Sequence, residues 1–135
     1  MNRSTNDALR EMRDKYIPPG HGSITASYVA SAKGALIWDV EGREFIDFAS
    51  GIGVMNVGHS HPKVVAAIKD QVEKFTHTCF MVVPYEPAVT LAEKLCAVTP
   101  GDFPKTTLFI NSGAEAVENA VKIARYHAKK TGIIA

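Results

Sequence analysis

The sequence has little of what marks membrane, secreted or nucleic-acid-binding chains. Its 15 basic and 14 acidic side chains leave a formal charge of +1, so it has no basic surplus for a phosphate backbone. Its longest apolar runs fall far short of the roughly 20 residues that cross a bilayer. The polar amino terminus, with charges of both signs, does not resemble a secretory signal. These absences exclude a membrane partner and a nucleic-acid partner, and they predict a cytoplasmic protein.

Metal-ligating residues are also scarce. Cys79 and Cys96 lack CxxC spacing, and two thiols cannot supply the four ligands of a structural zinc site. His59 and His61 flank Ser60 without a third ligand at a suitable spacing. The pattern predicts two reduced, partly buried thiols and two histidines in a loop and at a helix start, with no metal site.

What is present is typical of a globular chain, with 46% hydrophobic and 21% charged residues. Residues 1–34 are polar and rich in glycine and proline, with a short helix over 7–15 that Pro18-Pro19-Gly20 must end. We interpret this segment as an arm that lies over another part of the protein. Residues 36–49 alternate partially on either side of Gly42, which predicts a β-hairpin that turns there.

A glycine-containing loop and two helices follow. Residues 50–59 contain three glycines and no helical periodicity, so we expect a loop whose backbone passes close to protein or to a ligand. Proline at a first turn predicts helices from Pro62 and from Pro87, the second ending before Pro100. The first helix has one apolar face, formed by Val64, Val65, Ile68, Val72 and Phe75.

The last third has the pattern of a βαβ unit. Residues 106–110 are apolar and β-branched, as in a strand that is covered on both faces of a parallel sheet. A helix from residue 113 follows, and Gly132 is the predicted stop. Residues 133–135 then begin another apolar run. A strand, a helix and the start of a second strand cannot form a covered sheet, so we expect the amino-terminal piece of a longer protein.

The junction before this helix, Asn111-Ser112-Gly113-Ala114-Glu115, allows two interpretations. Ser112 and Glu115 form a capping box, in which the glutamate reaches back to the Ser112 amide. The same position, at the carboxyl end of a strand, suits an anion, because the free amides and the helix dipole favour negative charge. Neither the P-loop nor the dinucleotide-binding glycine pattern is present, which argues against ATP hydrolysis and NAD binding.

Four stretches, read together, identify a family. WDVEGREFIDFASGIGVMNVGHSHPKVVAAI, FTHTCF, VPYEP and NSGAEAVENAVKIAR occur in this order. Over residues 34–135 they resemble the amino-terminal portion of the class III pyridoxal-phosphate-dependent aminotransferases, and most closely the 4-aminobutyrate aminotransferases. The resemblance implies an α/β, fold-type I protein: residues 1–78 form an arm and part of the small domain, and residues 79–135 open the large domain with its parallel sheet. It also implies a homodimer.

The resemblance assigns site residues as well. Gly113 and Ala114 would give backbone amides to the phosphate of pyridoxal 5'-phosphate, with Ser112 beside them. Met81 stands where some 4-aminobutyrate aminotransferases have glutamine, which leaves the substrate open. Three residues are implied to line the substrate pocket: Ile52, Phe80 and Tyr85.

The implied reaction is ping-pong transfer of an amino group from an ω-amino acid, such as 4-aminobutyrate, to 2-oxoglutarate. By the family's layout the Schiff-base lysine follows Ala135, so no catalytic residue falls within the chain and the 135 residues alone are predicted to be inactive. Alternatives within the family are ornithine, diamine or other class III transamination. An alternative of another kind is a truncated, non-catalytic module for dimerisation or anion binding.

Overall fold

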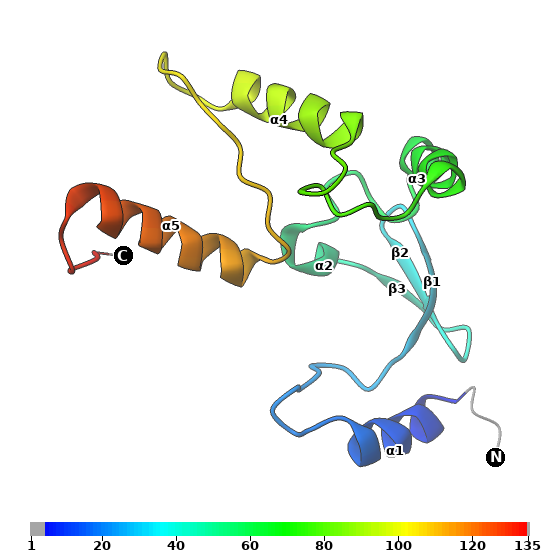
Figure 1. Ribbon diagram of the computed structural model, residues 1–135. Helices are drawn as coiled ribbons and strands as arrows, with labels where there is room; N and C mark the ends of the chain where they lie inside the picture. Colours follow the sequence, from blue (N-terminus) through cyan, green and yellow to red (C-terminus); the bar gives the residue numbers. More distant parts are fainter. Residues whose placement is uncertain (1–4, 135) are drawn as a thin grey trace. The chain divides into compact units, whose positions relative to one another are not determined.

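A computed structural model of the chain describes residues 5–134 (Figure 1). The chain forms two compact units that divide between His77 and Thr78. None of the helices within residues 5–134 is both long enough and apolar enough to cross a membrane.

The first unit contains a small antiparallel sheet, with the strand order β1-β2-β3. Only β2 and β3 were expected from the sequence, because β1 falls in the segment interpreted as an arm. That interpretation was incomplete: β1 pairs with β2 from Val29 to Lys33 and so contributes an edge of the sheet. The elements of this unit are α1 (Asn6–Tyr16), β1 (Val29–Lys33), β2 (Leu36–Asp39), β3 (Glu44–Ile46), α2 (Ser50–Gly53) and α3 (Pro62–Lys74).

The predicted hairpin is confirmed. Strands β2 and β3 pair antiparallel in a register that sets Ile37 opposite Phe45. Gly42 has φ of 81°, a left-handed conformation that glycine adopts without steric cost. Its amide donates to the carbonyl of Asp39 at 3.0 Å, which closes the turn.

The second unit contains the two predicted helices, α4 (Glu86–Val98) and α5 (Gly113–Ala128). The expected parallel sheet is absent from its described residues, and neither 106–110 nor 133–134 forms a strand. The reason is physical: a parallel strand needs a neighbour to complete its backbone hydrogen bonds, and no described segment of this unit supplies one. Ala135 lies outside the described residues.

Two further details of the second unit bear on the sequence predictions. Helix α5 ends at Ala128, and its C-cap residue is Lys129, which has φ of 54°, whereas the sequence predicted Gly132 as the stop. The Lys129 ammonium lies 3.7 Å from the centre of the Tyr126 ring, a cation–π contact that favours this early end. Cys79 and Cys96 are free, half-buried thiols, as the sequence predicted.

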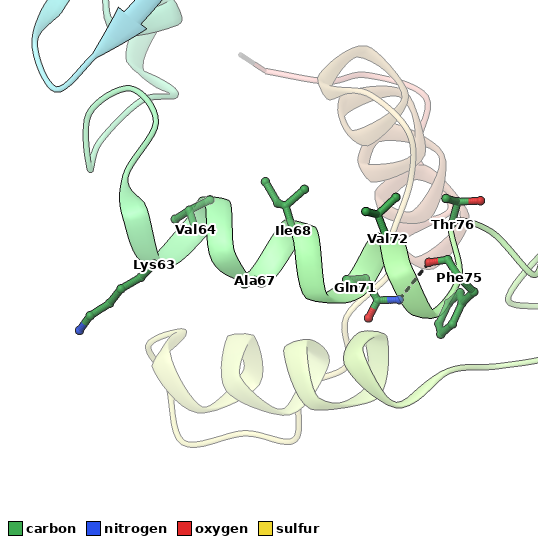
Figure 2. Close-up of a pocket in the computed structure, with 8 residues that line it drawn as sticks. All are labelled: Lys63, Val64, Ala67, Ile68, Gln71, Val72, Phe75 and Thr76. Carbon is green, nitrogen blue, oxygen red and sulfur yellow. Dashed lines mark hydrogen bonds between the residues drawn. The ribbon is translucent and has the colours of Figure 1, made fainter.

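The apolar faces of the helices are largely open. Helix α3 has a shallow apolar groove, and Figure 2 shows Val64, Ile68 and Val72 along one side of it. These three side chains are 47%, 61% and 54% exposed, and among residues 5–134 no apolar side chain is buried. The described chain therefore has no hydrophobic core, which is the usual main source of folding free energy.

A polar network takes the central place in the first unit. Asn6 and Asp39 are the two buried residues of the described chain. The Asn6 side chain donates to Asp39 Oδ2 at 3.0 Å and accepts from the Tyr28 amide at 2.7 Å, and its own amide donates to Glu41 Oε1 at 3.0 Å. The start of α1 is thereby joined to β2 and to the hairpin turn.

Asp39 accepts four hydrogen bonds. Its Oδ1 receives the amides of Glu41 and Arg43 at 3.0 and 2.9 Å, and its Oδ2 receives Asn6 and the Arg43 Nε at 2.7 Å. Burial raises the pKa of Asp39, but the hydrogen bonds from Arg43, Asn6 and the Glu41 amide outweigh it and lower the pKa to about 2. The carboxylate is therefore ionised at neutral pH.

Replacing Asn6 tests whether this network holds α1 in place. In Asn6→Ala, the Tyr28 amide and one Asp39 lone pair lose a partner, which costs roughly 1–3 kcal/mol. Amide hydrogen exchange across α1 should rise at least fivefold, as measured by mass spectrometry. Asp14→Ala is the matched control, because it breaks the exposed Arg13–Asp14 pair of the same helix. Equal exchange in the two variants would contradict the prediction.

Candidate functional site

The start of α5 is built by its capping residue. Ser112 has φ of −152° and ψ of 161°, so the backbone is extended before the helix begins. Its Oγ accepts from the Glu115 amide at 3.3 Å, and its carbonyl accepts from the Ala116 amide at 3.0 Å. Serine is a preferred residue here because its short side chain satisfies an amide of the first turn.

The other half of the predicted capping box is different. Glu115 Oε2 accepts from the Asn111 amide at 2.8 Å, whereas the sequence pattern predicted the Ser112 amide. The glutamate side chain has three rotatable bonds, so the pattern fixes its side of the helix and not which of two neighbouring amides it reaches. The carboxylate still lies on the amino-terminal side, where the helix dipole favours it.

The first turn of α5 can accept an anion. The amides of Gly113 and Ala114 have no carbonyl four residues earlier within the helix, and they carry the positive end of the helix dipole. A Cβ added at Gly113 would meet no atom within 4 Å, so space is open beside this turn. Two amides, a dipole and open space fit a phosphate group.

Phe80 and Tyr85, the predicted lining residues of the second unit, lie together. Their ring centres are 5.4 Å apart, and the planes meet at 88°, an edge-to-face pair. Thr78 closes the segment between them, because its Oγ1 donates to the Val83 carbonyl at 2.8 Å. Tyr85 occupies the N-cap position of α4, so its backbone lies at the start of that helix.

Ile52, the lining residue predicted in the first unit, lies in a strained turn. All four residues of α2 have positive φ, from 46° at Ser50 to 78° at Gly53, so α2 is one left-handed turn. Ile52 itself has φ of 57° and ψ of 60°, and its side chain is 90% exposed. A left-handed conformation costs roughly 1–2 kcal/mol per non-glycine residue, and it is a clear outlier for a β-branched one. Such strain is concentrated at functional sites.

Asp47 and His59 close the loop that contains this turn. Asp47 Oδ1 accepts the amides of Ala49 and Ser50, both at 2.9 Å, and its Oδ2 lies 2.6 Å from His59 Nε2. The sequence predicted His59 in a loop without a metal ion, but it did not indicate this contact with Asp47. An aspartate two and three residues before a small-residue turn is a signal for the bonds from the Ala49 and Ser50 amides, but it carries no information about His59.

The protonation of the pair follows from its contacts. The hydrogen bond from His59 lowers the pKa of Asp47, and the amides of Ser50 and Ala49 lower it further, against the opposing effect of burial. Asp47 is then an ionised carboxylate that can only accept hydrogen bonds. His59 Nε2 therefore carries the hydrogen of this bond.

The close approach expected of the glycine loop is an approach to protein. A Cβ added at Gly58 would lie 3.1 Å from the Cα and carbonyl oxygen of Gly34. His59 and Gly34 also exchange two backbone hydrogen bonds, of 2.8 and 2.9 Å. Gly58 thus allows the loop to lie directly against the β1–β2 turn.

Sequence comparison identifies the family. Residues 16–135 match the family model of the class-III aminotransferases. The chain belongs to this family and corresponds to its amino-terminal portion, as the resemblance predicted.

Named relatives show how much of such a protein the chain represents. The 5-aminovalerate aminotransferase of Pseudomonas aeruginosa is 53% identical over 131 residues, which cover 97% of this chain and 31% of that protein. The 4-aminobutyrate aminotransferase of Escherichia coli is 51% identical over 132 residues, covering 98% and 31%. The chain thus spans less than one third of the length of these relatives.

Solved structures agree with this assignment. The acetylornithine aminotransferase of Elizabethkingia anophelis is similar with a TM-score of 0.79 and 31% identity, covering 94% of this chain and 33% of that one. The ornithine aminotransferase of Toxoplasma gondii has a TM-score of 0.71 and 26% identity, covering 99% and 31%, and PLP partly occupies the active site of that protein. The fold is that of the amino-terminal region of a fold-type I aminotransferase.

The six residues predicted for the site form three groups. The capping serine and the two amides after it form one turn of α5, the two aromatic rings form one pair, and Ile52 lies in the left-handed turn of the first unit. These six residues were predicted from the sequence. The structure adds the left-handed conformation of Ile52 and the Asp47–His59 pair that closes its loop.

Two glycine substitutions test the close approach at Gly58. Gly58→Ala and Gly53→Ala carry the same conformational cost, because φ is 79° and 78°, but only Gly58 has an atom within 4 Å of the added methyl group. Gly58→Ala should therefore increase hydrogen exchange at the paired amides of Gly34 and His59, and Gly53→Ala should leave it unchanged. Protection that falls equally in both variants would show that φ, and not contact, determines the residue.

Proposed function

We propose that this chain is the amino-terminal portion of a pyridoxal-phosphate-dependent ω-amino-acid aminotransferase, which transfers an amino group from 4-aminobutyrate to 2-oxoglutarate. The observation that carries the proposal is the first turn of α5, where the amides of Gly113 and Ala114 have no carbonyl partner within the helix and space is open beside Gly113, in a member of the class-III family. The relatives at 51–53% identity are named for ω-amino acids, which supports the substrate class.

The cofactor phosphate would be held by backbone rather than by side chains. Gly113 and Ala114 would donate their amides, and the dipole of α5, a helix of 16 residues, would add to the attraction. Ser112 keeps this turn in place through its bond to the Glu115 amide, so its role is to orient the two donors. The bound cofactor supplies the electron sink on which an amino group passes between two substrates.

The substrate would be recognised along its methylene chain. Ile52, Phe80 and Tyr85 are apolar or aromatic, as a chain of methylenes requires, and none of them carries a positive charge to pair with a carboxylate. Residues 1–78 would then belong to the small domain and 79–135 to the large one, in a homodimer. The carboxylate partners and the lysine that binds the cofactor would come from the rest of the polypeptide.

A second substrate has a specific observation behind it. The relative from Pseudomonas aeruginosa acts by its name on 5-aminovalerate, which is one methylene longer than 4-aminobutyrate. A hydrophobic pocket separates substrates that differ by one methylene by about 10- to 200-fold.

The substrate is tested with the complete polypeptide that carries this chain. Purified with its cofactor, it should transfer an amino group from 4-aminobutyrate to 2-oxoglutarate with a kcat/KM about tenfold above that for 5-aminovalerate. Glutamate release measures the rate with each donor. A preference for 5-aminovalerate would reverse the two candidates, and no transfer from either donor would reject the proposed function.

The phosphate turn is tested by placing a negative charge in it. Ala114→Asp sets a carboxylate where the phosphate would bind, while an aspartate at this position favours the helix itself. Cofactor affinity in the complete polypeptide should fall at least tenfold, as followed by cofactor absorbance. Lys122→Gln makes the same change in net charge at an exposed site of α5, where Lys122 pairs with Glu118, and should alter affinity less than twofold. Equal losses in the two variants would place the phosphate elsewhere.

A further inference from the structure

The strained turn at Ile52 is part of a loop whose two ends are joined by Asp47 and His59, a contact we call the neck of the loop. Asp47 and His59 lie twelve positions apart, and their side chains meet at 2.6 Å. Both are largely buried: the side chains are 8% and 20% exposed, whereas Ile52, between them in the sequence, is 90% exposed. The two polar side chains are largely buried and the apolar one is exposed.

The backbones of Asp47 and His59 are both bonded to the turn between β1 and β2. The Asp47 amide donates to the Ala35 carbonyl at 2.8 Å, directly beyond β3. His59 exchanges two backbone hydrogen bonds with Gly34, the preceding residue of the same turn. The carboxylate and the imidazole are therefore held in register by the backbone before their side chains meet.

The turn itself depends on this neck. Asp47 accepts the two amides that lead into it, at Ala49 and Ser50, and the Ser50 carbonyl accepts the amides of Val54 and Met55 at 3.0 Å each. A β-branched residue leaves the left-handed region unless its surroundings determine the conformation. No apolar side chain is buried in the described chain, so core packing does not determine the conformation of Ile52. The hydrogen bonds of Asp47 and Ser50 are the contacts that fix the turn.

We propose that Asp47 and His59 are positioning residues for substrate selection: their hydrogen-bonded pair fixes the left-handed turn and so sets where the Ile52 side chain meets the methylene chain of the ω-amino acid. This inference rests on the proposed function, in which Ile52 lines the substrate pocket. Ile52 would contact the substrate, whereas Asp47 and His59 would not. Their effect passes entirely through the turn.

A double-mutant cycle in the holoenzyme distinguishes this role from general support of the fold. The quantity to measure is the ratio of kcat/KM for 4-aminobutyrate to that for 5-aminovalerate. Ile52→Ala should change this ratio about tenfold, and Asp47→Ala and His59→Ala should change it by a similar factor in the same direction. Because the pair acts through Ile52, the variant that combines Asp47→Ala with Ile52→Ala should stay within threefold of Ile52→Ala alone.

Asp39→Ala is the matched control. Asp39 is also a buried aspartate of the first unit, and its Oδ1 likewise accepts two backbone amides of a following turn. Its loss should destabilise the unit without changing the ratio of the two donors. Hydrogen exchange gives a reading independent of activity: the amides of Ala49 and Ser50 should exchange at least fivefold faster in Asp47→Ala than in Asp39→Ala.

The outcomes separate cleanly. A ratio in Asp47→Ala within twofold of wild type, or effects that multiply in the double variant, would overturn the positioning role while leaving the proposed function intact. A wild-type holoenzyme that transfers no amino group, or an Ile52→Ala variant with an unchanged ratio, would overturn the assignment of Ile52 and the inference with it. If Asp39→Ala shifts the ratio as far as Asp47→Ala does, the positioning role is overturned, whereas the assignment of Ile52 is unaffected.

Discussion

The first unit depends on one buried carboxylate. Asp39 joins the hairpin turn, through the amides of Glu41 and Arg43, to the start of α1, through Asn6. A buried charge is tolerated only when its hydrogen-bonding capacity is satisfied, and four donors satisfy this one. In a chain with no buried apolar side chain among its described residues, directional polar contacts define the geometry that packing defines elsewhere.

Asp47 repeats the arrangement at the next turn. Each aspartate lies at or just after the end of a strand, each accepts two amides that follow it, and each offers its second oxygen to a side chain, Arg43 in one case and His59 in the other. The first turn is relaxed around Gly42, whereas the second contains Ile52 in a left-handed conformation. The same local chemistry thus stabilises a structural turn and a strained one that projects an apolar side chain.

Local signals in the sequence were sufficient for most elements. Prolines at first turns located α3 and α4, and the hairpin followed from alternation around Gly42, because these patterns act within a few residues. Strand β1 was not predicted, because its residues carry no strand pattern of their own and its extended backbone is stabilised by pairing with β2. Residues 106–110 do not form the expected strand. Their pattern is typical of a strand in a parallel sheet, but such a strand needs neighbouring strands, and none is present among the described residues of the second unit. The predicted site residues come from the family motifs and stay a prediction, whereas the Asp47–His59 pair joins residues twelve apart that no local pattern connects.

The contact between Gly34 and Gly58 has a consequence for how this region can vary. Two backbones without side chains meet there, and the neck at Asp47 and His59 lies directly beside them. The segment from 48 to 57 therefore lies between two ends that are bonded to the same turn of the sheet, the β1–β2 turn. A library could randomise Ile52 and Val54, which are both largely exposed, and keep Asp47, Gly58 and His59 constant. Its members would present different side chains from a loop whose two ends keep the same contacts.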